Sequence, residues 1–132
     1  MMGSALAGNP PATGLGQAWP NAADASASPN FHAYVFMLGG VKYVQINDSN
    51  GNIIGAIGTA NGQFLTLPIG RDSQYVVTPN QAPPATSAPA ATPTTVYQDG
   101  TTAIRATPQL NGAISLQAVD CQDPAACAGR VQ

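Results

Sequence analysis

Tight-turn signals at short intervals constrain this chain more than any other feature of its sequence. They occur at Gly39-Gly40, Asp48–Gly51, Asn61-Gly62 and Asp99-Gly100. Residues of these types favour two-residue hairpins, because glycine, asparagine and aspartate tolerate the positive φ angles that such turns need. Connections this short cannot hold the crossover that joins parallel strands. The sequence therefore predicts an all-β fold, built as an antiparallel meander sheet or a small, partly open barrel.

Short apolar or alternating runs lie between these turns and predict the strands. They cover residues 31–38, 41–47, 53–57, 64–67, 74–78, 95–98, 101–105 and 113–119. Lys42 shares one strand face with Val44 and Ile46. Gly55 and Gly58 predict a bend, a bulge or a close backbone approach at the third strand.

The chain divides into three parts by composition. Residues 1–30 are rich in Ala, Gly, Pro, Asn and Ser, and we expect a disordered arm in which Trp19 anchors to the domain surface. Residues 31–120 are expected to form a single β domain, interrupted by a flexible Pro/Ala/Thr-rich loop at 79–95. The strands after this loop are expected to complete the sheet begun before it; the alternative is that the last third is only loosely attached. Residues 121–132 form a C-terminal tail.

Charged residues make up only 8% of the chain, with one lysine and no glutamate. Exposed helix faces usually depend on Glu and Lys, so this composition favours strands and turns. The net charge is −2, and no basic patch is available to bind nucleic acid or an anionic membrane. No stretch approaches the roughly 20 apolar residues of a membrane span. We therefore expect neither a nucleic-acid partner nor a transmembrane segment.

Cys121 and Cys127 are the only cysteines. A turn at Asp123-Pro124 would help to bring them within bridging range. In an oxidising compartment we expect a disulfide, worth on the order of 2 kcal/mol for so short a loop. The alternatives are two free thiols, or a metal or redox pair. The metal interpretation lacks a second pair of ligands, and a redox pair usually has the spacing Cys-x-x-Cys.

Residues suited to catalysis are scarce. His32 is the only histidine, and no Gly-x-Ser-x-Gly motif accompanies it. Three of the six aspartates fall in predicted turns, at Asp48, Asp99 and Asp123, where their carboxylates cap backbone N–H groups. We therefore predict no catalytic residues, no metal site and no cofactor, and a protein that is not an enzyme.

Aromatic side chains are the candidate binding residues. Tyr34, Tyr43, Phe64 and Tyr75 could line a ligand groove or a partner-binding face. The alternative is that they form the hydrophobic core, together with Phe36, because the domain has few other large residues.

Ala5-Leu6-Ala7 fits the small-x-small pattern that a signal peptidase reads, which favours export; the alternative is a cloning remnant before an alanine-rich tail. The chain resembles the small uncharacterised exported proteins of Gram-negative bacteria, which are rich in Ala, Pro, Gly and Thr and carry one cysteine pair. The resemblance implies a periplasmic, secreted or cell-surface location. The scarcity of charged residues, histidine and catalytic motifs favours a non-enzymatic role in protein binding or surface structure, in which the chain could act as an antigen. The alternative functions are a small-ligand or glycan-binding β domain and, less favoured, a small enzyme.

Overall fold

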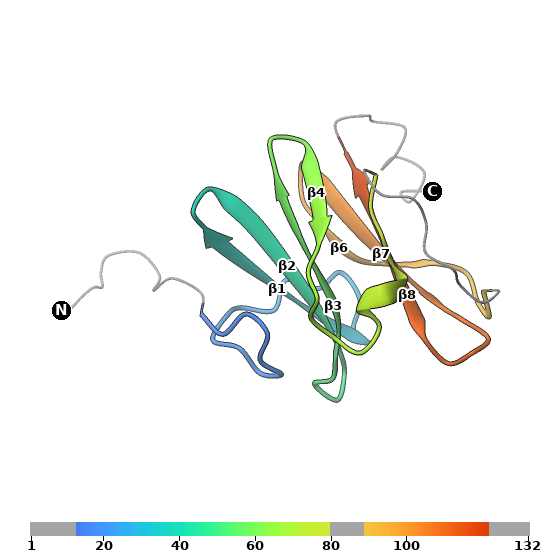
Figure 1. The fold of residues 1–132 in the computed structure, drawn as a ribbon. Coiled ribbons are helices and arrows are strands. Elements are labelled where there is room, and N and C mark those ends of the chain that lie inside the picture. Colours follow the sequence, from blue (N-terminus) through green and yellow to red (C-terminus); the bar gives the residue numbers. More distant parts are fainter. Residues whose placement is uncertain (1–12, 80–88, 122–132) are drawn as a thin grey trace.

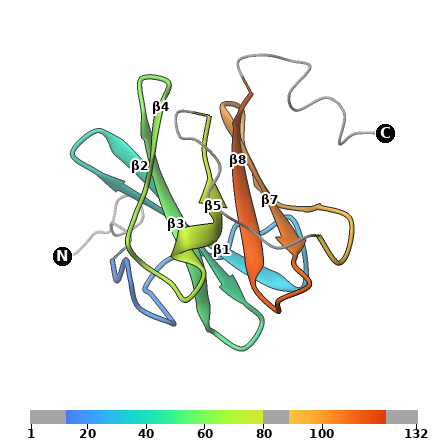
Figure 2. The same cartoon turned by 45° about the vertical axis from the view of Figure 1, so that its right-hand side comes forward.

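The computed structural model describes residues 13–79 and 89–121, which form two four-stranded β-sheets that face each other (Figures 1 and 2). The first sheet consists of β1 (Phe31–Leu38), β2 (Val41–Asp48), β3 (Ile53–Ala60) and β4 (Gln63–Thr66). The second consists of β5 (Val76–Val77), β6 (Thr94–Gln98), β7 (Thr102–Pro108) and β8 (Ile114–Asp120). Within the described residues the one helical element is the single 3-10 turn η1 (Ser73–Tyr75), and none of them forms a helix able to cross a membrane.

The first sheet is the predicted antiparallel meander, with strand order β1-β2-β3-β4. Its turns have the positive φ angles that their residues tolerate. Gly39 and Gly40 have φ angles of 59° and 81°, and Asn61 and Gly62 have 53° and 78°. The all-β class and this meander are therefore confirmed, and neither sheet closes into a barrel.

The expectation that the later strands complete the same sheet is wrong. Beyond β4 the chain follows the outer edge of β3, where the N–H of Leu67 bonds to Ala56 and that of Asp72 to Ile54. It then crosses through η1 into a second sheet of order β5-β8-β7-β6. Each sheet has an apolar inner face. Packing these two inner faces against each other removes both from water, which an open eight-stranded sheet would not do.

One strand pair in the second sheet is parallel. Only residues 76–77 of the predicted strand 74–78 form a strand, because residues 74–75 belong to η1. This short strand, β5, pairs with β8 at Val76–Leu116 and Val77–Gln117. Short connections do exclude parallel pairing of consecutive strands. However, β5 and β8 are separated in sequence by β6 and β7, so no tight crossover is required. The purely antiparallel arrangement holds for the first sheet only.

The core lies between the sheets. Its buried members are Ala33, Val44, Ile46, Ile54, Ile57 and Phe64 from the first sheet and Val76, Val96, Tyr97, Ile104, Ala106, Leu116 and Ala118 from the second. Gly55 lies at the closest approach: a Cβ there would stand 2.9 Å from Val76 Cγ2 and 3.1 Å from Leu116 Cδ1. The close approach predicted from this glycine is thus confirmed.

The N-terminal segment is more ordered than the sequence predicts. Residues 13–30 make defined contacts, whereas disorder was expected for all of residues 1–30. The N–H of Ala25 bonds to Ala33 of β1 at 2.7 Å, and that of Ala27 bonds to Val96 of β6 at 2.8 Å. This segment therefore bridges the edges of the two sheets. Residues 1–12, 80–88 and 122–132 lie outside the described residues.

Candidate functional site

The apolar pattern of the inner faces breaks at one end of the sandwich, where the β1–β2 and β3–β4 hairpins turn (Figure 1). On β2, Val44 and Ile46 enter the core, but the next inward position is Lys42. Cross-strand pairing places one residue from each strand of the first sheet in the same row. This row is Met37, Lys42, Thr59 and Phe64. The inner space at this end is therefore bordered by polar as well as apolar groups.

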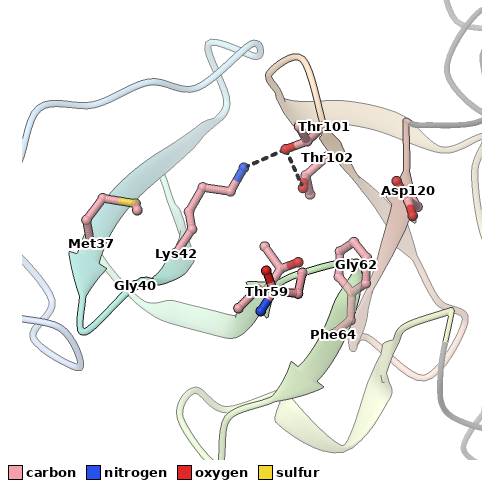
Figure 3. A pocket seen from close by; sticks show the side chains of 11 residues that line it. Met37, Gly40, Lys42, Thr59, Gly62, Phe64, Thr101, Thr102 and Asp120 are labelled. Carbon is pink, nitrogen blue, oxygen red and sulfur yellow. Dashed lines mark hydrogen bonds between the residues drawn. The ribbon is translucent and has the colours of Figure 1, made fainter.

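This row forms one wall of an open cleft with a volume of about 310 Å³, which we call the hairpin-end cleft (Figure 3). Thr101, Thr102 and Asp120 of the second sheet form the opposite wall. The remaining lining residues belong to the hairpins: Gly40, Ala60, Asn61 and Gly62. The cleft thus lies between the sheets, at the point where core packing ends.

Lys42 crosses the cleft and joins the two sheets. Its ammonium donates hydrogen bonds to Asp99 Oδ2 and, at 3.1 Å, to Thr101 Oγ1. The Tyr97 hydroxyl donates to the same Asp99 oxygen at 2.5 Å. Asp99 Oδ1 accepts from the backbone N–H groups of Thr101 and Thr102, at 2.7 and 2.8 Å. The carboxylate is therefore held from both sheets.

These contacts fix the charge on Asp99. Burial opposes its ionisation, but the hydrogen bonds from Lys42, Tyr97 and the Thr101–Thr102 backbone outweigh that effect and lower the pKa of Asp99 well below 3.8. Burial and the adjacent carboxylate raise the pKa of Tyr97 above its usual range. The network consequently holds one cation, one anion and one neutral phenol at neutral pH.

The network is poorly suited to nucleophilic catalysis. Thr101 Oγ1 lies beside Lys42, as in a nucleophile–lysine pair, but it also donates to Asp99 Oδ1 at 3.1 Å. The Lys42 ammonium donates to Thr101 Oγ1, so in this arrangement it takes no proton from that hydroxyl. The arrangement can orient a bound molecule and offers no activated nucleophile.

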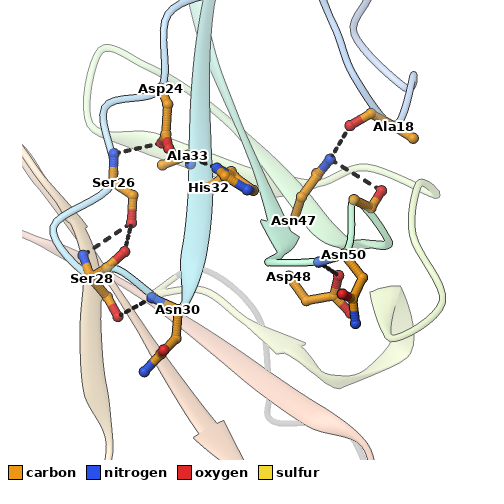
Figure 4. A network of polar contacts seen from close by, with 11 residues as sticks. Ala18, Asp24, Ser26, Ser28, Asn30, His32, Ala33, Asn47, Asp48 and Asn50 are labelled. Carbon is orange, nitrogen blue, oxygen red and sulfur yellow. Dashed lines mark hydrogen bonds and ion pairs between the residues drawn. The ribbon is translucent and has the colours of Figure 1, made fainter.

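A second polar cluster lies on the outer face of the first sheet (Figure 4). Gln45 and Asn47 are fully buried there under residues 16–18. Gln45 accepts from the Gly16 N–H at 2.7 Å and donates to the Gln17 carbonyl at 2.8 Å, and Asn47 donates to the Ala18 carbonyl at 2.6 Å. These two side chains attach the N-terminal segment to the sheet.

Trp19 follows directly and stays 62% exposed. Its ring meets His32 edge-on, with centroids 5.5 Å apart, and His32 stacks on Tyr34 at 5.9 Å. His32 Nδ1 contacts Asp24 Oδ2 at 2.7 Å. Burial opposes the charge on Asp24, but hydrogen bonds from the Ala33 N–H and from His32 lower its pKa. The described contacts of His32 include no serine or threonine hydroxyl, so no triad forms around it.

The four predicted binding aromatics do not gather in one place. Tyr34 is buried on the outer face of the first sheet, and Tyr43 packs on that face over Gly58. Phe64 points between the sheets, where it joins the core and lines the hairpin-end cleft. Tyr75 lies in η1, where its hydroxyl accepts from Asn111 at 3.2 Å. Only Phe64 belongs to the cleft.

Sequence reasoning missed most of the cleft residues: Lys42, Thr59, Thr101, Thr102 and Asp120. One signal was present, since Lys42 shares a strand face with two core residues. A lysine on an otherwise apolar strand face indicates a partner or a break in the core. The threonines gave no such signal, because threonine is common throughout strands.

The predicted disulfide lies partly outside the described residues. Cys121 follows β8, and its N–H donates to the Thr101 carbonyl at 2.9 Å, which ties this end of the strand to the cleft wall. Cys127 and Asp123 are not among the described residues, so the pairing stays a prediction. Over residues 13–79 and 89–121, no three His, Cys, Asp or Glu side chains gather in a group that could hold a metal ion.

Comparison with known proteins leaves the chain without a family assignment. No protein-family model, no curated protein and no solved structure matches it.

Proposed function

We propose that this chain is a non-enzymatic, exported binding protein that holds a small polar ligand in the hairpin-end cleft. One observation carries the proposal: a lysine stands at an inward position of a β-sandwich and is fixed there by a partner from the opposite sheet. A lysine ammonium has three donors, and the described contacts of Lys42 use two of them. The third is available to an acceptor on a ligand.

The lining of the cleft limits the chemistry of this ligand. Hydroxyl groups of Thr59, Thr101 and Thr102 both donate and accept, and the Phe64 ring offers an apolar surface. Lys42 and Asp99 balance each other's charge, so the cleft lining offers no excess positive charge. A net anion is therefore disfavoured. The ligand that fits is neutral or zwitterionic, of the size of a monosaccharide or a single amino acid, because the cleft is at the small end of ligand sites.

An exported location is part of the same proposal. It is supported by the cysteine pair, by Ala5-Leu6-Ala7 and by the composition of the chain. Detection of the endogenous protein in fractionated cells tests it. Recovery in the periplasmic or extracellular fraction is expected, and recovery with cytosolic markers would contradict it.

Amide chemical-shift mapping tests the ligand. Monosaccharides and free amino acids are titrated separately into the labelled full chain. We expect shifts confined to residues 37–42, 59–64, 99–102 and 120. Thr59→Phe fills the cleft and should abolish them, whereas Thr94→Phe, on an exposed position of β6, should leave them unchanged. If neither probe class produces saturable shifts around the cleft, the proposal fails.

A protein partner is the second candidate. Met37 and Leu38 are exposed apolar residues on the β1–β2 hairpin, and Met37 also lines the cleft. Exposed apolar residues beside a polar cleft are typical of contact surfaces. A pull-down from periplasmic extract should then capture a partner that the Met37→Ser/Leu38→Ser variant loses. Equal capture by both forms would exclude this surface.

A further inference from the structure

We propose that Trp19 and the β2–β3 turn form a second binding site, for a neutral saccharide, at the opposite end of the sandwich. This site comprises Trp19 and residues 48–52, and we call it the Trp19 platform. β2 runs from Lys42 at the cleft to Asp48 at the turn, a distance of about 20 Å at strand rise. The two sites are therefore separate surfaces of one molecule.

The first argument is that Trp19 is both exposed and held in place. An exposed tryptophan forgoes the burial that its large apolar surface would gain. Yet the three residues before it are fastened by the fully buried Gln45 and Asn47. Figure 4 shows the hydrogen bond from Asn47 to the Ala18 carbonyl. Two buried amide side chains thus fix a segment whose most prominent side chain faces solvent. This is the arrangement expected of a preorganised contact residue.

The second argument is the packing of the Trp19 ring against the β2–β3 turn. Gly51 has a φ of +88°, and a Cβ at that position would lie 2.6 Å from Trp19 Cζ2 and 2.7 Å from Cε2. The indole therefore rests directly on the turn backbone, in space that any other residue would fill. His32 supports the ring from another direction, edge-on at 5.5 Å. The ring is consequently restrained before any ligand arrives.

The third argument is the set of polar groups around the ring. Asn50 and Asn52 are exposed in the same turn, and Asp48 accepts hydrogen bonds from both backbone N–H groups at 2.9 Å. Arg71 reaches the turn as well, with Nη1 3.7 Å from Asp48 Oδ2. Amide and guanidinium groups are planar and make directional hydrogen bonds. These donors and acceptors belong to, or reach, the same turn on which the apolar ring rests.

This combination matches the chemistry of a sugar ring. One face of a pyranose presents C–H groups that stack on an aromatic ring, and its hydroxyl rim suits amide and guanidinium partners. Asp24 and Asp48 beside the platform make it unfavourable for phosphate, so nucleic acids and anionic lipids are poor candidates. A neutral saccharide is the class that fits both the ring and its surroundings.

Trp19 is the only tryptophan, so fluorescence excited selectively at tryptophan, beyond the absorption of the four tyrosines, reports on this site alone. Maltotriose, cellotriose and chitotriose serve as probes. We expect a saturable change in Trp19 emission, with amide shifts at residues 48–52. A saccharide that shifts only residues 59–64 and 99–102 would leave the cleft proposal intact and overturn the platform. No response to any of the three probes would overturn it too.

Two variants distinguish a role of Trp19 in ligand contact from a role in the stability of the fold. Trp19→Ala should weaken saccharide binding, followed by calorimetry, at least about tenfold, since a central aromatic contact is worth that much. Its thermal unfolding should be little changed, because the ring is mostly exposed. Leu110→Ala removes an equally exposed apolar side chain elsewhere and should bind as the parent does. Undiminished binding by Trp19→Ala would refute the assignment.

Discussion

At the scale of single residues, Lys42 and Asp99 connect the two sheets where the core ends. Their side chains are 16% and 30% exposed, so the pair is partly shielded from water. Removing one partner of such a pair costs more stability than the intact pair contributes, because the remaining charge is left without a partner. Tyr97 and Thr101 complete the network. The stability of the fold therefore depends on the charge of Asp99.

Asp99→Asn keeps the side-chain acceptor of the turn but removes the charge that pairs with Lys42. We expect the free energy of unfolding to fall by about 2 kcal/mol at neutral pH. The folded-state pKa of Asp99 lies below its unfolded value of 3.8, so its contribution is present above that pH and lost as pH falls further. Urea unfolding across this acid range should show a shallower pH dependence for the variant. An unchanged slope would mean that Asp99 is not the titrating group.

A substitution at Gly70 tests whether the chain after β4 packs closely against the backbone of β3. It has a φ of +102°, and a Cβ there would stand 2.5 Å from the Ile54 carbonyl oxygen. Because backbone cannot move aside as a side-chain tip can, Gly70→Ala should cost more than 2 kcal/mol in denaturant unfolding. Gly62→Ala is the matched control: its φ is +78°, but nothing lies within 4 Å. It should lose about 1 kcal/mol from backbone strain alone, and equal losses for the two variants would show that the close approach is absent.

At the scale of elements, the N-terminal segment behaves as part of the first sheet. It contributes backbone hydrogen bonds to β1 and β6 and covers buried amides of β2. Its sequence gives little sign of this, since Pro, Gly and Ala carry no strand periodicity. The signal lies in β2 instead, where Gln45 and Asn47 are polar residues that need buried partners.

Gln45→Met should therefore release the segment without unfolding the sheets. The variant removes the acceptor of the Gly16 N–H and the donor to the Gln17 carbonyl while keeping the side-chain volume. We expect the Gly16 amide to lose protection in hydrogen exchange, with strand amides of β2 and β3 keeping theirs. Gln63→Met, at an exposed site on β4, is the control. Retained protection at Gly16 would contradict the assigned contact.

The turns could be predicted from the sequence, whereas the packing of one sheet face against the other could not. Asn61-Gly62 and Gly39-Gly40 select their backbone locally, so sequence alone places them. Alternation likewise shows which residues share a face, as it did for Lys42, Val44 and Ile46. Which face packs against which depends on contacts between distant residues, such as Gly55 with Leu116. The cleft was missed for the same reason, because Lys42 and Asp99 are 57 positions apart.

At the scale of the whole molecule, two small sheets share a core made largely of Ala, Val and Ile. Such a core buries modest apolar area, and additional links between distant parts of the chain then matter to the stability of the whole. The described residues supply the Lys42–Asp99 ion pair and the bridging N-terminal segment as such links. A C-terminal disulfide would add a covalent restraint near the cleft wall.

We predict that Cys121 and Cys127 are joined in the protein purified under oxidising conditions. Intact-mass measurement after thiol alkylation should show no added label until the protein is reduced. Reduction should lower the free energy of unfolding by about 2 kcal/mol, since the closed loop is short. Labelling of both thiols without reductant would exclude the bond.

The most direct test of the two-sheet arrangement is the pattern of nuclear Overhauser effects between the halves of the chain. The sandwich predicts contacts between the Leu116 methyl groups and the α-protons of Gly55, and between Val76 and the same glycine. Their observation, with uniform backbone relaxation over residues 31–79 and 94–120, would confirm that the sheets face each other. Absence of these contacts, with residues 94–120 tumbling independently, would contradict both the fold and the cleft that depends on it.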